Sequence, residues 1–291
     1  MKYVILLISI LLSTLLPVTA HPAERDSMLE NIAFYADVMV NADRDVHRLK
    51  AHDIFKKSLQ IFLEQPGSFS QSLDSIPWLS VIHADNFRMI SWQLRKSNEE
   101  YSYGGYIQWP EKLVELKDTR PWVNGSLRNT YSPGSWYGAL YYKILPFKCG
   151  KETAYVLFGF NAENSMVNTK VADVLDLTGA EPKFGLPVFE GQDGDQTRLI
   201  LTYADASSVQ LFYDPELNAI VHDHLENLPG VGPSGEVLAV SDGSQEGWFL
   251  KNEKWVYQET VYDVKSELPP MSEDRKERKE DKDLFGRPKK E

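Results

Sequence analysis

Cysteine is almost absent from this sequence. Cys149 is the only one in 291 residues, so the chain cannot form an internal disulfide. The fold must instead be held by a hydrophobic core, and hydrophobic residues make up 42% of the chain. Cys149 precedes Gly150 in an expected turn. A reactive thiol is one interpretation there, and a partly buried side chain without a chemical role is the one we favour.

Familiar catalytic and nucleotide-binding motifs are missing as well. The sequence contains neither a G-x-x-x-x-G-K-[ST] loop nor a G-x-G-x-x-G turn, and we therefore expect no nucleotide cofactor. It has no G-x-S-x-G elbow and no S-x-x-K motif, so a serine nucleophile is not indicated. A carboxylate pair for glycoside hydrolysis stays open, because acidic residues are numerous and their separation depends on the fold.

Positive charge is in the minority. The 42 acidic residues outnumber the 31 Lys and Arg residues, which gives a formal net charge of −11. An acidic surface repels nucleic acid and anionic lipid, and we expect neither as a partner. The same surface is compatible with cations, with neutral glycans or with a basic protein partner.

Long apolar runs are confined to the start of the chain. Lys2 precedes an apolar run over residues 3–16, and small residues follow up to Ala20. This is the pattern of a signal peptide over residues 1–20, which predicts cleavage after Ala20 and a mature chain beginning at His21. A membrane-anchoring helix is the weaker alternative, because the run is shorter than the ~20 residues that span a bilayer. With no second run of this kind, we expect no membrane span in the mature chain. An exported protein without disulfides fits the bacterial periplasm or the extracellular space.

Two helices are predicted over residues 27–65. Ser27 and Glu30 have the spacing of a capping box. Polar residues 41–43 separate the helices and can cap the second one, which Gln65-Pro66-Gly67 ends. His52 falls beside the apolar stripe of the second helix, where a packing histidine is favoured over a ligand. The stripes expected to face the core are Met28, Ile32, Tyr35, Ala36 and Met39, and then Val46, Leu49, Phe55, Leu59 and Phe62.

From residue 78 to residue 264 the pattern changes to short β-strands. Residues 136–160 hold two nearly continuous apolar runs around Gly150, which predicts a hairpin covered on both faces. Pro146 should end or bulge its first strand, and Gly104-Gly105 indicates a bulge or a close backbone approach. Other strands are expected over residues 79–84, 87–94, 101–109, 112–116, 170–177, 182–189, 198–204, 208–213, 219–225, 247–251 and 255–261, with 198–204 paired to 208–213.

Two segments lack this strand pattern. Residues 118–134 form a long predicted loop with Arg120, Trp122, Arg128 and Tyr131, and long loops are often functional. Residues 265–291 are charged and poor in apolar side chains, which predicts a disordered tail.

The fold class that follows is mainly β, of the α+β type. We expect an N-terminal helix pair followed by about a dozen short, mostly antiparallel strands in a sandwich or barrel-like arrangement. The helices should lie on one face or one end of the sheets. Residues 21–264 are predicted to form a single globular domain.

His222 and His224 are the sharpest candidate for a metal site. Alternation along a strand places both rings on one face, and two histidines can begin a zinc site that needs a third ligand. His83 is the remaining histidine in the middle of the chain. However, Ile220 shares the face of the pair, and His-x-His arises on strands by chance, so we favour no metal site. Asp193-Gly194-Asp195 and Asp242-Gly243-Ser244 resemble fragments of a calcium loop, but the full ligand pattern is absent and plain turns are favoured.

Aromatic residues are plentiful, with seven Trp and 14 Tyr. They could line a sugar-binding groove, although β cores also use them, and the core interpretation is favoured. The function expected first is a non-enzymatic envelope or extracellular binding protein with a protein or glycan partner. The alternative is a secreted hydrolase with a carboxylate or metal site. The residues themselves assign no catalytic group, cofactor or metal ligand.

A set of strand and turn segments carries one resemblance. The segments are residues 87–92, 136–159, 183–189 and 198–203, Leu211-x-Tyr213-Asp214, His222-x-His224-Leu225, Asp242-Gly243-Ser244 and Trp255. In these segments the chain resembles a group of uncharacterised secreted proteins of Bacteroidota-type bacteria. The resemblance covers most of the mature chain and implies a β-rich fold. It implies no functional residue, because the group has no known activity.

Overall fold

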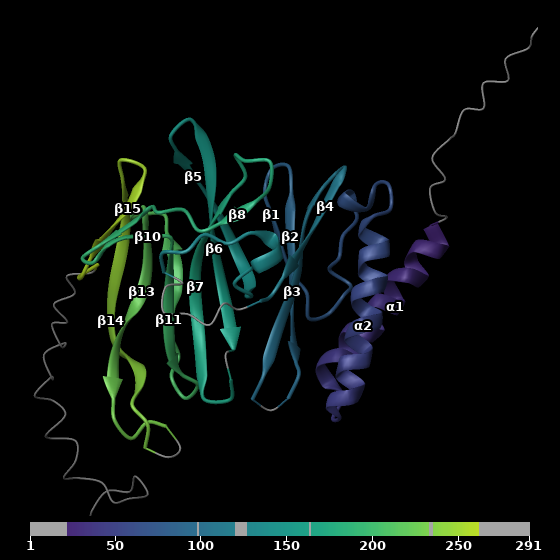
Figure 1. Ribbon diagram of the computed structural model, residues 1–291, viewed down its shortest axis with the longest axis horizontal. Coiled ribbons are helices and arrows are strands. Elements are labelled where there is room, and N and C mark those ends of the chain that lie inside the picture. The colour runs from purple at the N-terminus through teal and green to yellow at the C-terminus, as the bar shows by residue number, and fades with distance from the viewer. Residues whose placement is uncertain (1–21, 98, 120–126, 163, 233–234, 262–291) are drawn as a thin grey trace, which may run out of the picture.

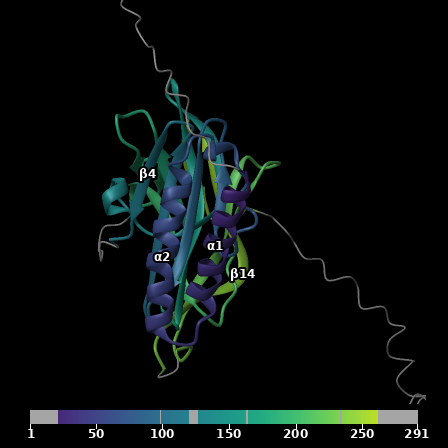
Figure 2. The same ribbon diagram turned by 90° about the vertical axis from the view of Figure 1, so that its right-hand side faces the viewer.

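The computed structural model describes residues 22–97, 99–119, 127–162, 164–232 and 235–261. Within them, a pair of helices and three β-sheets stack as successive layers (Figure 1). The two helices run side by side along the outer face of the first sheet (Figure 2). The fold is therefore mainly β with segregated helices, as predicted, and of the two predicted arrangements the sandwich is correct.

The helices are α1 (Pro22–Asn41) and α2 (Asp45–Leu63). The first sheet has the strand order β1-β2-β3-β4 and contains β1 (Ser80–His83), β2 (Arg88–Arg95), β3 (Tyr101–Trp109) and β4 (Lys112–Lys117). The central sheet has the order β11-β7-β6-β5, with β8 beside β7, and contains β5 (Leu140–Cys149), β6 (Glu152–Ala162), β7 (Val167–Asp176), β8 (Lys183–Phe184) and β11 (Arg198–Ala204). The last sheet has the order β10-β9-β15-β14-β13-β12 and contains β9 (Phe189–Gly191), β10 (Gly194–Gln196), β12 (Leu211–Asp214), β13 (Ala219–Leu228), β14 (Leu238–Lys251) and β15 (Lys254–Gln258). Among the described strands every pairing is antiparallel except that of β9 with β15.

Three hydrophobic cores fill the spaces between these layers. Strand β6 shows how one sheet serves two of them. Leu157 belongs to the core between the first and central sheets, whereas Val156 and Phe158 belong to the core between the central and last sheets. Successive strand residues point to opposite faces, so a sheet with both faces covered needs almost continuous apolar sequence. The prediction that the hairpin of residues 136–160 is covered on both faces is confirmed for β6 and wrong for β5, where Tyr142, Lys143 and Pro146 are exposed.

The helix stripes are confirmed in part. Phe55, Leu59 and Phe62 of α2 are buried, as are Ile32, Ala36 and Met39 of α1. The prediction is wrong for Val46 and Leu49, which are 56% and 39% exposed. His52 packs beside Trp92, with ring centroids 6.3 Å apart, and burial lowers the pKa of this histidine. That is the behaviour expected of a packing histidine.

Arg48 is buried at the start of α2, where the apolar stripe predicted that Val46 and Leu49 would be buried. Its guanidinium donates to the carbonyl oxygens of Ala42, Asp43 and Arg95, at 2.7, 3.0 and 3.1 Å, and also pairs with the Asp45 carboxylate. Burying a charged group is tolerated when its N–H groups are paired in this way. These contacts fasten the turn between the helices to the end of β2.

Both helices begin elsewhere than predicted. α1 begins at Pro22 and not at Ser27, so the Ser27–Glu30 spacing lies inside the helix. Proline suits a first helical position, because its missing N–H would be unpaired there in any case. Residues 41–43 do not cap α2: its N-cap is Arg44, which forms no capping bond through its side chain.

Strand predictions are wrong at Pro146 and over residues 182–189, and the strand predicted over residues 247–251 begins at Leu238. Pro146 neither ends nor bulges β5; it lies within the strand opposite Tyr155, and the irregularity falls between Tyr141 and Lys143. The proline is tolerated because β5 is the edge strand of its sheet. Residues 182–189 do not form one strand, since they are divided between β8 of the central sheet and β9 of the last.

The predicted pairing of residues 198–204 with 208–213 is also wrong. Strand β11 pairs with β7, whereas β12 pairs with β13. The short connection between them crosses from the central sheet to the last sheet instead of closing a hairpin. Each strand therefore pairs with a strand of the sheet in which it is buried.

Gly104 allows a close approach of side chain to backbone. A Cβ atom at Gly104 would lie 2.2 Å from Cζ2 of Trp92, while the pairing of β2 with β3 continues through this position without a shift. Of the two predicted alternatives, close approach is confirmed and the bulge is wrong. The indole packs against Phe55 and Tyr106, with centroids 5.3 and 5.6 Å away, and so joins α2 to the first sheet.

A buried ion pair fastens the described end of the long loop to the central sheet. Nε of Arg198 donates to Oδ1 of Asp173 at 3.1 Å, and both side chains are 0% exposed. The same guanidinium donates to the carbonyl oxygens of Asn129 and Phe184, at 2.9 and 3.2 Å. It also lies over the ring of Tyr131, 4.4 Å from the centroid. This part of the loop is thus structural. Arg120 and Trp122 lie outside the described residues.

Two predictions concern the ends of the chain. The signal peptide of residues 1–20 and the tail of residues 265–291 both lie outside the described residues. In the part of the chain that is described, neither helix combines the length and the apolar character needed to cross a membrane.

Candidate functional site

The histidine pair of β13 meets one carboxylate on β14. His222 lies opposite Glu246 in the ladder, and the irregularity after Asp223 brings His224 to the same side chain. Nδ1 of His224 lies 2.5 Å from Oε1 of Glu246, and Nε2 of His222 lies 3.8 Å from Oε2. The two rings therefore converge on one carboxylate, consistent with the shared face that alternation predicts.

His222 is a neutral, buried imidazole with both nitrogens engaged. Its Nε2 lies 3.1 Å from the indole Nε1 of Trp248, which can only donate, so Nε2 accepts and the proton sits on Nδ1. That Nδ1 donates to the carbonyl oxygen of Asp223 at 3.0 Å. Burial lowers the pKa of His222, and neighbouring carboxylates oppose this only in part. Its lone pair is thus already used inside the protein.

His224 differs, because its side chain is 40% exposed. The hydrogen bond to Glu246 raises the pKa of His224, and the charges of Asp242 and Glu226 raise it further. Burial, together with a hydrogen bond to Glu246, raises the pKa of Tyr257 to about 12. Glu246 therefore interacts with both His224 and Tyr257, and the three side chains form a small acid–base group on the last sheet.

In the described part of the chain, a third metal ligand does not join this pair. His83 is exposed on β1, in the first sheet, and the histidine pair belongs to the last sheet. Among the residues that the structure describes, no three His, Cys, Asp or Glu side chains converge in a way that could hold a metal ion. A zinc site needs three or four such ligands around one point.

The two acidic turns have ordinary roles. Asp193-Gly194-Asp195 spans the turn from β9 to β10, where Asp195 binds the Lys254 ammonium at 2.7 Å. Asp242-Gly243-Ser244 is the extra segment of β14 opposite His224, and Oδ1 of Asp242 accepts from the Ser244 amide and hydroxyl at 2.8 and 2.7 Å. The first segment follows the predicted turn into β10, whereas the prediction of a plain turn is wrong for Asp242-Gly243-Ser244, which lies within β14 at the irregularity of its pairing with β13.

Cys149 is not activated as a nucleophile. It ends β5, half-buried, and pairs across the hairpin with Glu152. Burial and the charges of Glu253 and Asp176 raise the pKa of its thiol, whereas reactive cysteines have a lowered pKa. The partial burial of Cys149 agrees with the favoured interpretation of a partly buried side chain.

Most tryptophans belong to the cores, as favoured from the sequence. Four of them are at most 6% exposed: Trp92, Trp136, Trp248 and Trp255. Trp122 lies outside the described residues. Of the other two, Trp109 is half-buried against Phe87, with ring centroids 5.8 Å apart, and Trp78 is 51% exposed. Among the described tryptophans, Trp78 is thus the one that is exposed enough to stack on a sugar.

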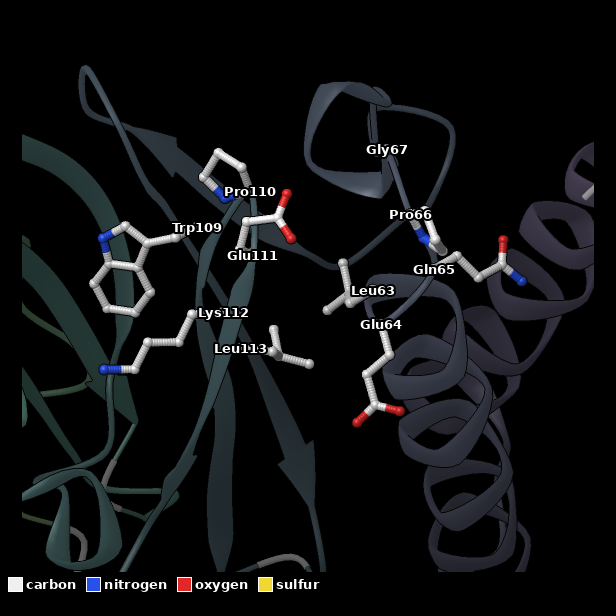
Figure 3. A pocket seen from close by; sticks show the side chains of 10 residues that line it. All are labelled: Leu63, Glu64, Gln65, Pro66, Gly67, Trp109, Pro110, Glu111, Lys112 and Leu113. Carbon is white, nitrogen blue, oxygen red and sulfur yellow. The ribbon is translucent and has the colours of Figure 1, made fainter. Parts of the chain in front are cut away.

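A hollow opens where the end of α2 faces the turn between β3 and β4 (Figure 3). Its volume is about 270 Å³. Leu63 and Leu113 approach each other across the gap, and the carboxylates of Glu64 and Glu111 project from the two sides. Trp109 and Lys112 lie on the far side of the β3–β4 turn, with the ammonium 5.3 Å from the indole centroid. The lining residues are Leu63, Glu64, Gln65, Pro66, Gly67, Trp109, Pro110, Glu111, Lys112 and Leu113.

Negative charge dominates the helix side of this hollow. Glu64 is the C-cap residue of α2, whose last turn contains no basic residue. A helix C-terminus carries partial negative charge, so an acidic residue there is unfavourable by about 0.3–1 kcal/mol unless a cation compensates it. The charge of Glu64 also acts on a tyrosine of the core. Burial raises the pKa of Tyr106, and the charges of Glu115 and Glu64 raise this pKa further.

This hollow was not predicted from the sequence. Its two walls are about 45 residues apart, and each was interpreted only as the end of a helix or strand. Glu64 at the end of a helix without a basic neighbour was the one local signal, since the usual preference there is for Lys, Arg or His. Comparisons with protein-family models, with curated proteins and with solved structures found no match to this chain.

Proposed function

We propose that this chain is an exported, non-enzymatic binding protein that contacts a protein partner at the hollow between α2 and the β3–β4 turn. The hollow carries the proposal, because it combines apolar walls with charged groups at its rim. Concave sites of this composition are where proteins usually bind ligands and partners. Its walls come from the ends of well-packed elements, so a partner meets a preformed surface.

The state of the other candidate groups supports binding over catalysis. His222 has both nitrogens engaged within the protein, and Asp173 is buried against Arg198. Cys149 has a raised pKa. His222, Asp173 and Arg198 thus serve the packing of the fold, and the hollow is a concave surface of the described chain with charged groups at its rim.

A site-specific cross-link tests the proposal. A photo-reactive amino acid is placed at the exposed Pro110, on the rim of the hollow, and in a control chain at the exposed Glu216, in the β12–β13 turn of the last sheet. In cells of the natural source, we expect a discrete cross-linked species from position 110 only. Leu113→Trp, which fills the hollow, should abolish it. Equal cross-linking from both positions, or cross-linking that survives Leu113→Trp, would refute a partner site here.

A glycan partner is favoured by one observation, at a different place. Trp78 is half-exposed, and its backbone lies in the left-handed region with φ +66°, a conformation that is costly for a bulky residue. Its indole donates to Oδ1 of Asp37 at 3.3 Å, which holds the ring at the surface. Sugar binding there predicts that Trp78→Ala removes glycan retention on an affinity gel, and retention that persists would exclude this ring.

A secreted hydrolase is the second candidate function. It is favoured by the His224–Glu246–Tyr257 group, in which a solvent-accessible imidazole is paired with a carboxylate. Such a pair can serve as a general base for water. Screening with chromogenic ester, phosphoester and glycoside substrates tests this candidate. Turnover that disappears in Glu246→Gln would favour the hydrolase over the binding protein.

A further inference from the structure

The imidazole of His222 holds the indole of Trp248 through its one acceptor nitrogen. Nε2 of His222 accepts the indole N–H at 3.1 Å, while Nδ1 donates to the carbonyl oxygen of Asp223 at 3.0 Å. The indole packs against the rings of Phe189 and Tyr257, with centroids 5.6 and 5.2 Å away. Trp248 and Phe189 belong to the core between the central and last sheets. The hydrogen bond to His222 therefore fixes the position of a large side chain in that core.

A proton on Nε2 of His222 is incompatible with this bond. An imidazolium carries an N–H on each nitrogen and has no lone pair left, and an indole can only donate. Two donors would then face each other at a separation of 3.1 Å. The bond from Nδ1 to the Asp223 carbonyl survives, because that nitrogen is a donor in both states. Protonation of His222 thus removes one of its two hydrogen bonds and keeps the other.

Glu246 offers the protonated nitrogen a different partner. Its Oε2 lies 3.8 Å from Nε2 of His222, which is beyond hydrogen-bond length but within reach of a small rotation of either side chain. Its Oε1 accepts from Nδ1 of His224, which anchors the carboxylate beside His222. The Glu246 side chain is 15% exposed, so its attraction for a charged imidazole is only weakly screened by salt.

Other ionisable groups surround His222. Within the last sheet they are Asp223, His224 and Glu226 on β13, Asp242 and Glu246 on β14, and Tyr257 on β15. From the central sheet they are Tyr142, whose hydroxyl bonds the Leu211 carbonyl opposite His222, and Lys170, whose ammonium lies over the Tyr142 ring. Burial lowers the pKa of His222, and the Asp223 carbonyl and the charges of Glu246 and Asp223 raise this pKa again in part. His222 is therefore neutral at pH 7 and becomes protonated in acid.

We propose that His222 is an acid-sensitive switch whose Nε2 exchanges Trp248 for Glu246 when it is protonated. One nitrogen has two partners within reach, and its protonation state selects between them, which is the requirement for a switch of this kind. At neutral pH the imidazole fixes the indole. In acid it pairs with the carboxylate and releases the indole, so the core between the central and last sheets loosens. The switch lies in the last sheet and does not depend on the partner site proposed above.

NMR of the indole N–H groups tests the exchange. Protein labelled with ¹⁵N at tryptophan is titrated from about pH 8 to about pH 4, a range that spans the ordinary pKa of histidine. We expect the indole proton of Trp248 to shift upfield, as the loss of a hydrogen bond predicts, with the same midpoint as the ring protons of His222. The indole signals of Trp92 and Trp136, in the other two cores, should keep their positions.

Three results of this titration would overturn the switch. The first is a Trp248 signal that stays in place while His222 titrates. The second is a His222 ring that stays neutral over the whole range while the fold is intact. The third is a simultaneous collapse of all indole signals, because global unfolding would then replace the local exchange.

Matched variants identify the groups that exchange. His222→Gln keeps an acceptor near the position of Nε2 and cannot be protonated, so the Trp248 signal should become independent of pH. Glu246→Gln removes the negative charge that attracts the protonated ring, so the midpoint of the Trp248 transition should fall by about 1 unit. His224→Gln leaves Nε2 of His222 and both its partners in place, and the transition should persist. An unchanged midpoint in Glu246→Gln, or loss of the transition in His224→Gln, would refute the exchange.

Discussion

Removing the charge of Arg198 is the most demanding test of how this stack is held together. In Arg198→Met, the guanidinium no longer donates to Asp173, and the carbonyl oxygens of Asn129 and Phe184 lose the same donor. Methionine keeps much of the apolar volume, so the change is chiefly one of charge and hydrogen bonding. Asp173 keeps the hydrogen bond from the Tyr141 hydroxyl at 3.1 Å but has lost its counter-charge.

The magnitude follows from the burial of the pair. Both side chains are 0% exposed, so water cannot replace the missing partner. Removing one member of a buried ion pair typically costs about 3–5 kcal/mol, because the other charge stays in a medium that solvates it poorly. Against a total stability of about 5–15 kcal/mol, that is a large fraction. Adding Asp173→Asn removes the unpaired charge, so the double variant should be more stable than the sum of the two single changes predicts, by about 1–3 kcal/mol.

Urea unfolding monitored by circular dichroism and tryptophan fluorescence measures both quantities. We expect a much lower midpoint for Arg198→Met and partial recovery in the double variant. A loss below about 1 kcal/mol for Arg198→Met, or strict additivity of the two changes, would refute the reasoning that an uncompensated buried charge dominates the cost.

Three further predictions concern the histidine pair and the glycine beneath Trp92. NMR titration should place the midpoint of His224 above about 6.5 and that of His222 below it, given the raised and lowered pKa values. The stability contributed by His224 is therefore complete below about pH 6.5 and is lost as pH rises through its raised pKa. The stability contributed by His222 is complete above about pH 6.5 and is lost as pH falls through its lowered pKa. In thermal melting across pH, His224→Gln should therefore remove the first of these dependences and His222→Gln the second. Purified protein should contain well under one zinc per chain, and stoichiometric zinc that disappears in the double His→Gln variant, measured by atomic emission, would contradict this. Gly104→Ala should cost about 1–3 kcal/mol or more in urea unfolding, because its Cβ would overlap the indole, whereas Gly134→Ala, with its nearest neighbour at 3.8 Å, should be nearly neutral.

Local features of this fold could be predicted from the sequence, because they depend on neighbouring residues. The strand over residues 101–109 and the strand over residues 198–204 have the predicted ends, and β6 of the hairpin of residues 136–160 is covered on both faces, as its continuous apolar pattern indicated. Alternation also indicated that His222 and His224 share a face. Side-chain direction along a strand is fixed by its immediate geometry, so one segment is enough to predict it.

Features that depend on distant segments could not be predicted in this way. Strands β11 and β12 are separated by a short polar turn that also suits a hairpin, and only the layer that buries each strand decides its partner. Arg48 is buried because carbonyl oxygens from two separate segments surround it. Hydropathy records the cost of burying arginine but not the partners that offset this cost. The hollow was missed for the same reason, since its walls meet only in the folded chain.

The order of the layers in space nearly repeats their order along the chain, from the helix pair through the first and central sheets to the last (Figure 1). During synthesis, β6 and β7 are therefore complete before most of the last sheet exists. The face that bears Val156, Phe158 and Val174 lacks most of its cover until residues 211–258 are made. A nascent chain of intermediate length exposes a bare apolar sheet, the kind of surface that aggregates or recruits chaperones. The nascent chain is thus most prone to aggregation from the synthesis of β7 until β15 has been made.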